Sequence, residues 1–403
     1  MLKKIDIQHL KPGMYVANIT QTGVSLHAHE REGRIKDEKT IESLRKRGIR
    51  SVYIDDEQGL DSDQAKPIAE VDRKMEQAIK AIVPESPQVA KVSFEQEFEK
   101  ADKLHHQALD LVENAMALAK AGKTVEVGPF EDTANNFIDS ITRNQNALAC
   151  LTRIRDKDSY LMEHSVNVAV LMGILGRHLK LQPQYLHECV TGALLHDIGK
   201  ILIPDSVLHK PGKLTEDEFT IMKRHASLSR QILQESQEFP EVCVNIAGQH
   251  HERMDGNGYP DGLSGEQISP EGRMASVVDV YDAITANRVY HKGLTPSSGF
   301  KRLLKWAGPH LDTQYVHGFI KAMGIYPIGS LVELNNGLLA IVQEETDTSM
   351  KPVVRTLYDT NRRDYCKQRR IDLSQAQEYS IKQVVDPNSY GIDLTSFLKR
   401  PIY

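Results

Sequence analysis

The chain has 403 residues, 40% hydrophobic and 26% charged, a balance typical of folded globular proteins with two or three domains. Its 50 Lys and Arg residues against 55 Asp and Glu residues leave a net charge of −5, which argues against long nucleic acid as a partner. The longest apolar stretch, VAVLMGIL at 168–175, is too short to span a membrane, and the start MLKKIDIQHL lacks the apolar core of a signal peptide. We therefore expect a cytoplasmic protein with no membrane partner.

The first 60 residues predict a small α/β or β unit. Pro12-Gly13 marks a turn before a strand that starts at Met14. Residues 39–47 suit a helix ended by Gly48, and residues 51–55 suit a second strand.

The rest of the chain is predicted to be mainly helical. Residues 56–95 are polar and interrupted by prolines, as in a linker or a partly helical connector. Residues 94–121 have helical spacing and stop at Gly122, and long amphipathic windows fill 135–325. Beyond them, two short β-like runs are separated by Asn336-Gly337, a strong hairpin signal.

Histidine is unevenly distributed along the chain. Of its 16 histidines, half fall within residues 164–251: His164, His178, His187, His196, His209, His225, His250 and His251. The four cysteines are far apart and form no CxxC pair, which argues against a disulfide scaffold and against a thiolate zinc site.

Seven of the histidines and aspartates lie on the apolar side of predicted helices. The pair His196-Asp197 ends an apolar window, and His225 follows Phe219 and Met222 at helical spacing, so we expect it on the core-facing side. Its helix starts at Thr215 with a capping box. The full set is His164, His196, Asp197, His225, His250, His251 and Asp279.

These seven residues together predict a metal site. A hydrogen-bonded imidazole would explain any one of the histidines by itself. However, Asp279 lies between valines, and a buried carboxylate needs a cation or strong donors. Imidazole and carboxylate ligands without thiolates suit iron, manganese, nickel or zinc with open positions. Seven ligands fit two ions that share a bridging carboxylate, and paired ions favour hydrolysis of a phosphate ester.

Two motifs resemble those of one enzyme family. HDIGK at 196–200 and HHERMDGNGYP at 250–260 are similar to the HD-GYP subgroup of the HD-domain metal-dependent phosphohydrolases, and KPGKLTEDE at 210–218 and PDGLSGEQI at 260–268 match as well. The resemblance covers about 140–325. It implies a helical HD-GYP domain that hydrolyses a cyclic dinucleotide, chiefly cyclic di-GMP, to the linear dinucleotide and sometimes on to GMP.

The resemblance also implies roles for individual residues. The seven residues above would be ligands of two divalent ions, with iron expected and manganese or nickel as alternatives, and Asp197 would bridge them. Lys200 would support charge on the phosphate, or else face solvent. The expected substrate contacts are Gly258, Tyr259 and Pro260 in a turn that shapes the pocket, and Arg288 and Lys292.

This sequence departs from the family pattern at two places. Some members bind a third metal through a glutamate one turn before the first histidine, and here that position is Tyr160. We therefore expect two metals and a reaction that stops at linear pGpG. In addition, the usual R-P-Y-R/K segment reads Arg288-Val289-Tyr290-His291-Lys292, where Lys292 would replace the lost charge or be solvated.

The resulting prediction is a mainly α bacterial signalling enzyme. We expect an N-terminal regulatory or dimerising domain with a helical linker at 1–135, the phosphohydrolase domain at 136–330 and a β-containing extension at 331–403. Two alternatives stay open: hydrolysis of 3′,3′-cyclic GMP-AMP, and a non-catalytic module that binds a cyclic dinucleotide or docks a cyclase-domain protein through the 255–265 loop.

Overall fold

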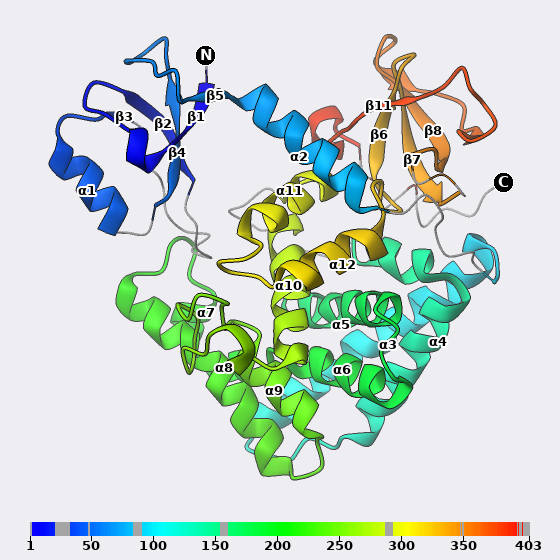
Figure 1. Cartoon of the computed structure of the whole chain (residues 1–403). Helices are drawn as coiled ribbons and strands as arrows, with labels where there is room; N and C mark the ends of the chain where they lie inside the picture. Colours follow the sequence, from blue (N-terminus) through cyan, green and yellow to red (C-terminus); the bar gives the residue numbers. More distant parts are fainter. Residues whose placement is uncertain are drawn as a thin grey trace. The chain divides into compact units, whose positions relative to one another are not determined.

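A computed structural model describes residues 2–20, 33–46, 49–83, 91–153, 160–286, 293–346, 348, 350–392, 394 and 397 (Figure 1). The chain divides into two compact units, residues 1–81 and 82–403, which we call the N-terminal and C-terminal units. Within the described ranges, a search for a helix with the length and apolar character of a membrane span finds none.

The N-terminal unit is a small antiparallel sheet with helix α1. Its five strands have the order β3-β2-β4-β1-β5. Alternate residues of β4, Val52 and Ile54, point into the core and meet Ile41 of α1, which explains the period-two pattern of this strand. The elements are β1 (Leu2–Asp6), η1 (Ile7–His9), β2 (Tyr15–Thr20), β3 (Gly33–Arg34), α1 (Glu38–Lys46), β4 (Ser51–Asp55), β5 (Lys66–Pro67) and α2 (Ile68–Ile82).

The C-terminal unit is helical over most of its length, which confirms the predicted mainly α fold. Its helices are α3 (Phe94–Lys120), α4 (Gly128–Leu151), α5 (Tyr160–His178), α6 (Pro183–Leu195), η2 (Ile198–Leu202), α7 (Asp205–Leu208), α8 (Glu216–Ser236), α9 (Glu241–Gln249), η3 (Gly265–Gln267), α10 (Pro270–Thr285), α11 (Pro296–Trp306) and α12 (Thr313–Met323).

Helix α5 is the central element of this unit. Every residue from Glu163 to Gly176 is buried, and the helix contacts α3, α4, α6, α10 and α12. A helix that is apolar on all sides lies in the middle of a bundle, because each of its faces must be covered. The stretch VAVLMGIL therefore forms the centre of the fold, and polar residues on α5 are held rigidly inside it.

The end of the C-terminal unit is an antiparallel sheet, as predicted. The expected hairpin joins β6 to β7, with Gly337 at a φ of +84° in the turn. The strands run in the order β10-β8-β7-β6-β11, with β9 paired to β8. They are β6 (Leu331–Leu334), β7 (Leu338–Glu344), β8 (Val353–Asp359), β9 (Asp364–Tyr365), β10 (Arg370–Asp372) and β11 (Ile381–Val384), followed by η4 (Pro387–Tyr390).

Candidate metal centre

Five helices bring all seven predicted ligands to one place. His164 is on α5, His225 on α8 and Asp279 on α10. His196 and His250 are the C-cap residues of α6 and α9. Asp197 is not on the helix as expected: with φ −107° and ψ 7°, it lies in the turn that leads into η2. The chain therefore turns away after His196, and the adjacent side chains still reach one site.

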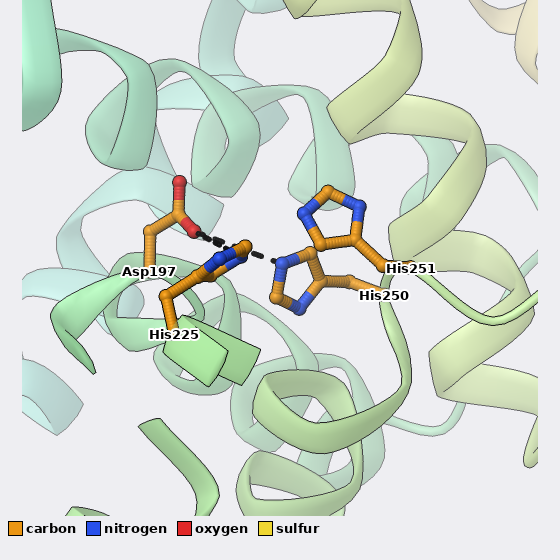
Figure 2. A group of neighbouring side chains, drawn as sticks. All are labelled: Asp197, His225, His250 and His251. Atoms are coloured by element: carbon orange, nitrogen blue, oxygen red, sulfur yellow. Dashed lines mark ion pairs between the residues drawn. The ribbon is translucent and has the colours of Figure 1, made fainter. Parts of the chain in front are cut away.

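The carboxylate of Asp197 lies between two groups of histidines. Its Oδ1 atom is 3.3 Å from Nε2 of His225 and 3.7 Å from Nε2 of His250 (Figure 2). Its Oδ2 atom is 3.4 Å from Nε2 of both His164 and His196. Two sets of candidate ligands thus share this residue: Asp197 with His225, His250 and His251, and Asp197 with His164 and His196.

Asp279 is a second carboxylate between the same groups. Its Oδ1 atom is 3.0 Å from Nε2 of His164 and 3.9 Å from Nε2 of His196. Its Oδ2 atom is 3.7 Å from Nδ1 of His251. Asp279 is 5% exposed and comes directly after two buried valines, so its carboxylate needs a cation or strong donors on the side of these histidines.

Backbone carbonyl groups orient three of the imidazole rings. Nδ1 of His196, His225 and His250 donates to carbonyl oxygens three or four residues earlier, at 2.7 to 3.1 Å. The proton is therefore on Nδ1, and the Nε2 lone pair is directed away from the helix toward the shared carboxylate. Such an outer hydrogen bond fixes the tautomer of a histidine that binds a metal through its other nitrogen.

Several atoms at the centre lack the partner that burial demands. Among the described residues, none forms a hydrogen bond with Nε2 of His196, His225 or His250, or with Oδ1 of Asp197. An unpartnered buried polar atom normally costs about 1–3 kcal/mol, and four in one place are not tolerated without a reason. The four atoms point inward from nitrogen and oxygen donors, so the residues fit divalent metal ions.

The protonation states of three histidines at the centre also suit metal binding. Burial lowers the pKa of His225 to about 3, and burial likewise lowers the pKa of His196 and His251. These rings are neutral near pH 7, which is the form that binds a metal. Burial would raise the pKa of Asp197, but the Lys200 ammonium and the His196 imidazole outweigh it and keep the pKa well below its usual range.

The HDIGK motif depends on its glycine for a close helix contact. A Cβ atom at Gly199 would approach the carbonyl oxygen of His225 to 2.4 Å. The amide of Gly199 instead donates to Oγ of Ser229 at 2.8 Å, which ties η2 to α8. Lys200, in the same turn, donates from Nζ to Oδ2 of Asp197.

The predicted turn at Gly258, Tyr259 and Pro260 lies against the metal centre. The Tyr259 ring is 4.7 Å from the His251 ring, centroid to centroid. At Gly258 an added Cβ atom would approach Cα of Glu252 and the amide nitrogen of Arg253 to 2.5 Å, so no larger residue fits without a shift. The turn therefore covers one edge of the site.

Other predicted residues lie outside the described part of the chain or differ from the prediction in their contacts or burial. Arg288 and Lys292 are outside the described residues. Tyr160 stacks on His164 at a ring distance of 6.1 Å and an interplanar angle of 8°, at the position where a third metal ligand was considered. Phe219 was expected on the core side of α8, but it is only partly buried, whereas His225 is fully buried.

Two buried carboxylates near the centre were not predicted. Asp282 accepts a hydrogen bond of 2.7 Å from Nδ1 of His164. Glu252, which is 2% exposed, accepts from the amides of Asp261 at 2.7 Å and Gly262 at 3.0 Å. Asp282 could have been found from its place one helical turn after Asp279, since i and i+3 share a face.

Comparisons with known proteins agree with this site. Residues 149–315 match the HD domain family, residues 2–130 a domain of unknown function (DUF3391) and residues 331–392 a KOW domain associated with HD domain. A cyclic di-GMP phosphodiesterase of Pseudomonas aeruginosa is 35% identical over 93% of this chain and 90% of its own length.

Two further relatives match a smaller share of the chain. A cyclic di-GMP phosphodiesterase response regulator of Xanthomonas campestris is 39% identical over 44% of this chain and 48% of its own. A 3′3′-cGAMP-specific phosphodiesterase of Vibrio cholerae is 42% identical over 30% of this chain and 24% of its own. With the HDIGK and GYP motifs at one centre, and a relative that matches over nearly its whole length, the chain belongs to the HD-GYP family of HD-domain proteins.

Proposed function

We propose that this protein hydrolyses cyclic di-GMP to linear pGpG at a centre that holds two divalent metal ions. The observation that carries the proposal is the position of Asp197, whose two oxygens face different histidine groups 3.3 to 3.7 Å away. A carboxylate shared in this way could hold two ions, one through each oxygen. The cyclic di-GMP phosphodiesterases among its relatives support the choice of substrate.

The two groups of candidate ligands indicate which residues would hold each ion. His225, His250 and His251 would hold one ion, and His164, His196 and Asp279 the other, with Asp197 between them. When bound, two such ions activate a water nucleophile near neutral pH and polarise the phosphoryl oxygens. The nitrogen and oxygen ligand set suits iron, with manganese or nickel as alternatives.

Lys200 would act on the phosphate directly. Its ammonium is at Oδ2 of Asp197, and its side chain is 19% exposed, so the group borders both the shared carboxylate and the solvent-facing side. From there it stabilises negative charge that develops on the phosphate in the transition state. Arg288 and Lys292 remain predicted phosphate contacts.

Tyr160 favours a centre of two ions and a single hydrolytic step. Its ring is parallel to the His164 ring, and a phenol is a poor substitute for a carboxylate ligand of a hard cation. We therefore propose that the reaction stops at pGpG. The domain boundaries, a homodimer, a cyclase-domain partner at 255–265, a regulatory N-terminal domain and a cytoplasmic location stay predictions.

The test is anaerobic incubation of the purified protein with Fe²⁺ or Mn²⁺ and cyclic di-GMP, with products separated by chromatography and metal content measured in parallel. We expect pGpG without GMP and about two metal ions per chain. Asp197→Ala should lose both the pGpG product and the bound metal. If the metal-loaded protein binds cyclic di-GMP but releases no linear product, the enzyme proposal is wrong and the binding-module alternative holds. Parallel assays with 3′,3′-cyclic GMP-AMP are needed, since a relative is specific for it.

A further inference from the structure

A series of aromatic rings leads from the metal centre onto helix α8. The His250 and His251 rings are 4.1 Å apart, and the His251 and Tyr259 rings 4.7 Å apart. The Tyr259 ring then meets the Phe219 ring at 6.3 Å, edge to face at 86°. The Lys223 ammonium lies 5.3 Å from the centre of the Phe219 ring. The rings are therefore in contact from a candidate metal ligand to a cation.

Exposure shows on which side a substrate reaches the metal centre. The side chains of His196, Asp197, His225 and His250 are at most 2% exposed, whereas those of His251 and Lys200 are 17% and 19% exposed. A phosphate that enters from solvent would therefore meet His251 and Lys200 first. Because Tyr259 covers His251 and Phe219 touches Tyr259, the aromatic series borders this entrance.

Phe219 has no role in the core that would explain its place. It is only partly buried, although its spacing from His225 would allow a core position. A phenylalanine and a lysine four residues apart are an ordinary helix pair, and by themselves they would mean little. Here the pair is joined through Tyr259 to a residue of the metal centre, and none of the described carboxylates forms an ion pair with Lys223.

We propose that Phe219 and Lys223 form a nucleobase subsite for the part of the cyclic dinucleotide that is not attacked. The inference rests on the proposed function and deepens it. With one phosphodiester at the metal centre, the rest of the substrate ring must lie outside the buried histidines. A purine stacks on the Phe219 ring, and the Lys223 ammonium turns from that ring to the second phosphodiester. Aromatic side chains bind bases this way because every base has a π-face.

The experiment separates substrate binding from chemistry. The full-length, manganese-loaded protein is assayed with methyl 4-nitrophenyl phosphate, a phosphodiester without a nucleobase, and cyclic di-GMP is added as a competitor to obtain its inhibition constant. Variants are Phe219→Ala, Phe219→Leu, Phe219→Tyr and Lys223→Gln. The control is Tyr365→Ala, which removes a 53% exposed aromatic ring of the C-terminal sheet.

We expect Phe219→Ala and Phe219→Leu to raise the inhibition constant about 10-fold, and Phe219→Tyr to keep it within about twofold. Lys223→Gln should raise it about threefold at low salt, with the difference lost at high salt. In all four variants, the turnover of methyl 4-nitrophenyl phosphate should stay within about twofold of the wild-type value.

Two results would overturn the subsite: an unchanged inhibition constant in Phe219→Ala, or an equal loss with both compounds, which indicates a structural role. Failure of the proposed function looks different. In that case the wild-type protein turns over methyl 4-nitrophenyl phosphate but forms no pGpG, and the inhibition constants still report whether Phe219 binds the dinucleotide. If cyclic di-GMP does not inhibit the wild-type protein, the subsite is overturned as well.

Discussion

The Nδ1 atom of His164 donates a hydrogen bond of 2.7 Å to Oδ2 of Asp282, and both residues are at least 98% buried. The bond fixes the ring so that Nε2 faces the carboxylates of Asp197 and Asp279, at 3.4 and 3.0 Å. A carboxylate behind a histidine in this way also makes the imidazole a stronger metal ligand. We therefore predict that Asp282 positions His164 within the candidate metal centre.

Replacing Asp282 should weaken metal binding without removing a ligand. We expect Asp282→Asn to lower metal affinity or turnover about 10- to 100-fold, since the ring loses its charged acceptor. Metal affinity is measured by the metal content that remains after dialysis, and activity by the turnover of cyclic di-GMP. The matched control is Asp364→Asn, an exposed change on β9. Full metal content and normal turnover in Asp282→Asn would show that the hydrogen bond has no functional role.

A methyl group at Gly258 should displace the turn that holds Tyr259 over His251. The added Cβ atom would lie 2.5 Å from two backbone atoms, so the turn itself must move. We expect Gly258→Ala to lower kcat/KM for cyclic di-GMP by about tenfold or more, as small misplacements in active sites commonly do. Gly128→Ala is the control, because nothing lies within 4 Å of its Cβ position and its φ is ordinary. Equal activity of the two variants would contradict the prediction.

Much of the metal centre was predictable because its residues leave local signals. A histidine or aspartate in an apolar helical window is conspicuous, and this applies to His164, His196 and Asp279. The capping box at Thr215 and Glu218 was also predicted and is formed, with Oε2 of Glu218 accepting from the amide of Thr215 at 2.7 Å. These features depend on neighbours within a few residues, so periodicity and spacing were enough.

The contacts of the supporting carboxylates could not be predicted in the same way. Asp282 meets a histidine 118 residues earlier, and Glu252 holds amides in a loop whose path no local pattern specifies. Phe219 was assigned to the core from helical spacing, but the ring is only partly buried and packs edge to face on Tyr259. In each case the decisive contact is tertiary, and sequence spacing on one helix contains no information about it.

Metal removal should destabilise the protein. A ligand that binds only the folded state adds RT ln(1 + [L]/Kd), about 4 kcal/mol at a thousandfold excess over Kd. We expect a chelator to lower the melting temperature of the wild-type protein by several degrees, with recovery when Mn²⁺ is restored. Asp197→Asn should show a much smaller chelator effect, because its shared carboxylate faces both histidine groups. The same shift in both proteins would mean that the metals bind elsewhere.

Glu345 should make the stability of the C-terminal unit depend on pH. Its carboxylate lies against Gly324, at the C-terminal end of α12, where an added Cβ atom would be 2.7 Å from Oε1. Burial raises the pKa of Glu345 from 4.5 to about 7. The negative end of the helix dipole repels a charged carboxylate there, and this repulsion raises the pKa in the same direction as burial.

The sign of the effect follows from proton uptake. Between pH 4.5 and 7 the folded state holds the Glu345 proton and the unfolded state has lost it, so stability falls as pH rises through this range and levels off above it. The full effect is at most about 3 kcal/mol. Urea unfolding at pH 5 and pH 8.5 should therefore show Glu345→Gln gaining stability over the wild-type protein only at the higher pH. The exposed change Glu378→Gln serves as the control, and a pH-independent difference between Glu345→Gln and the wild-type protein would show that Glu345 ionises normally in the fold.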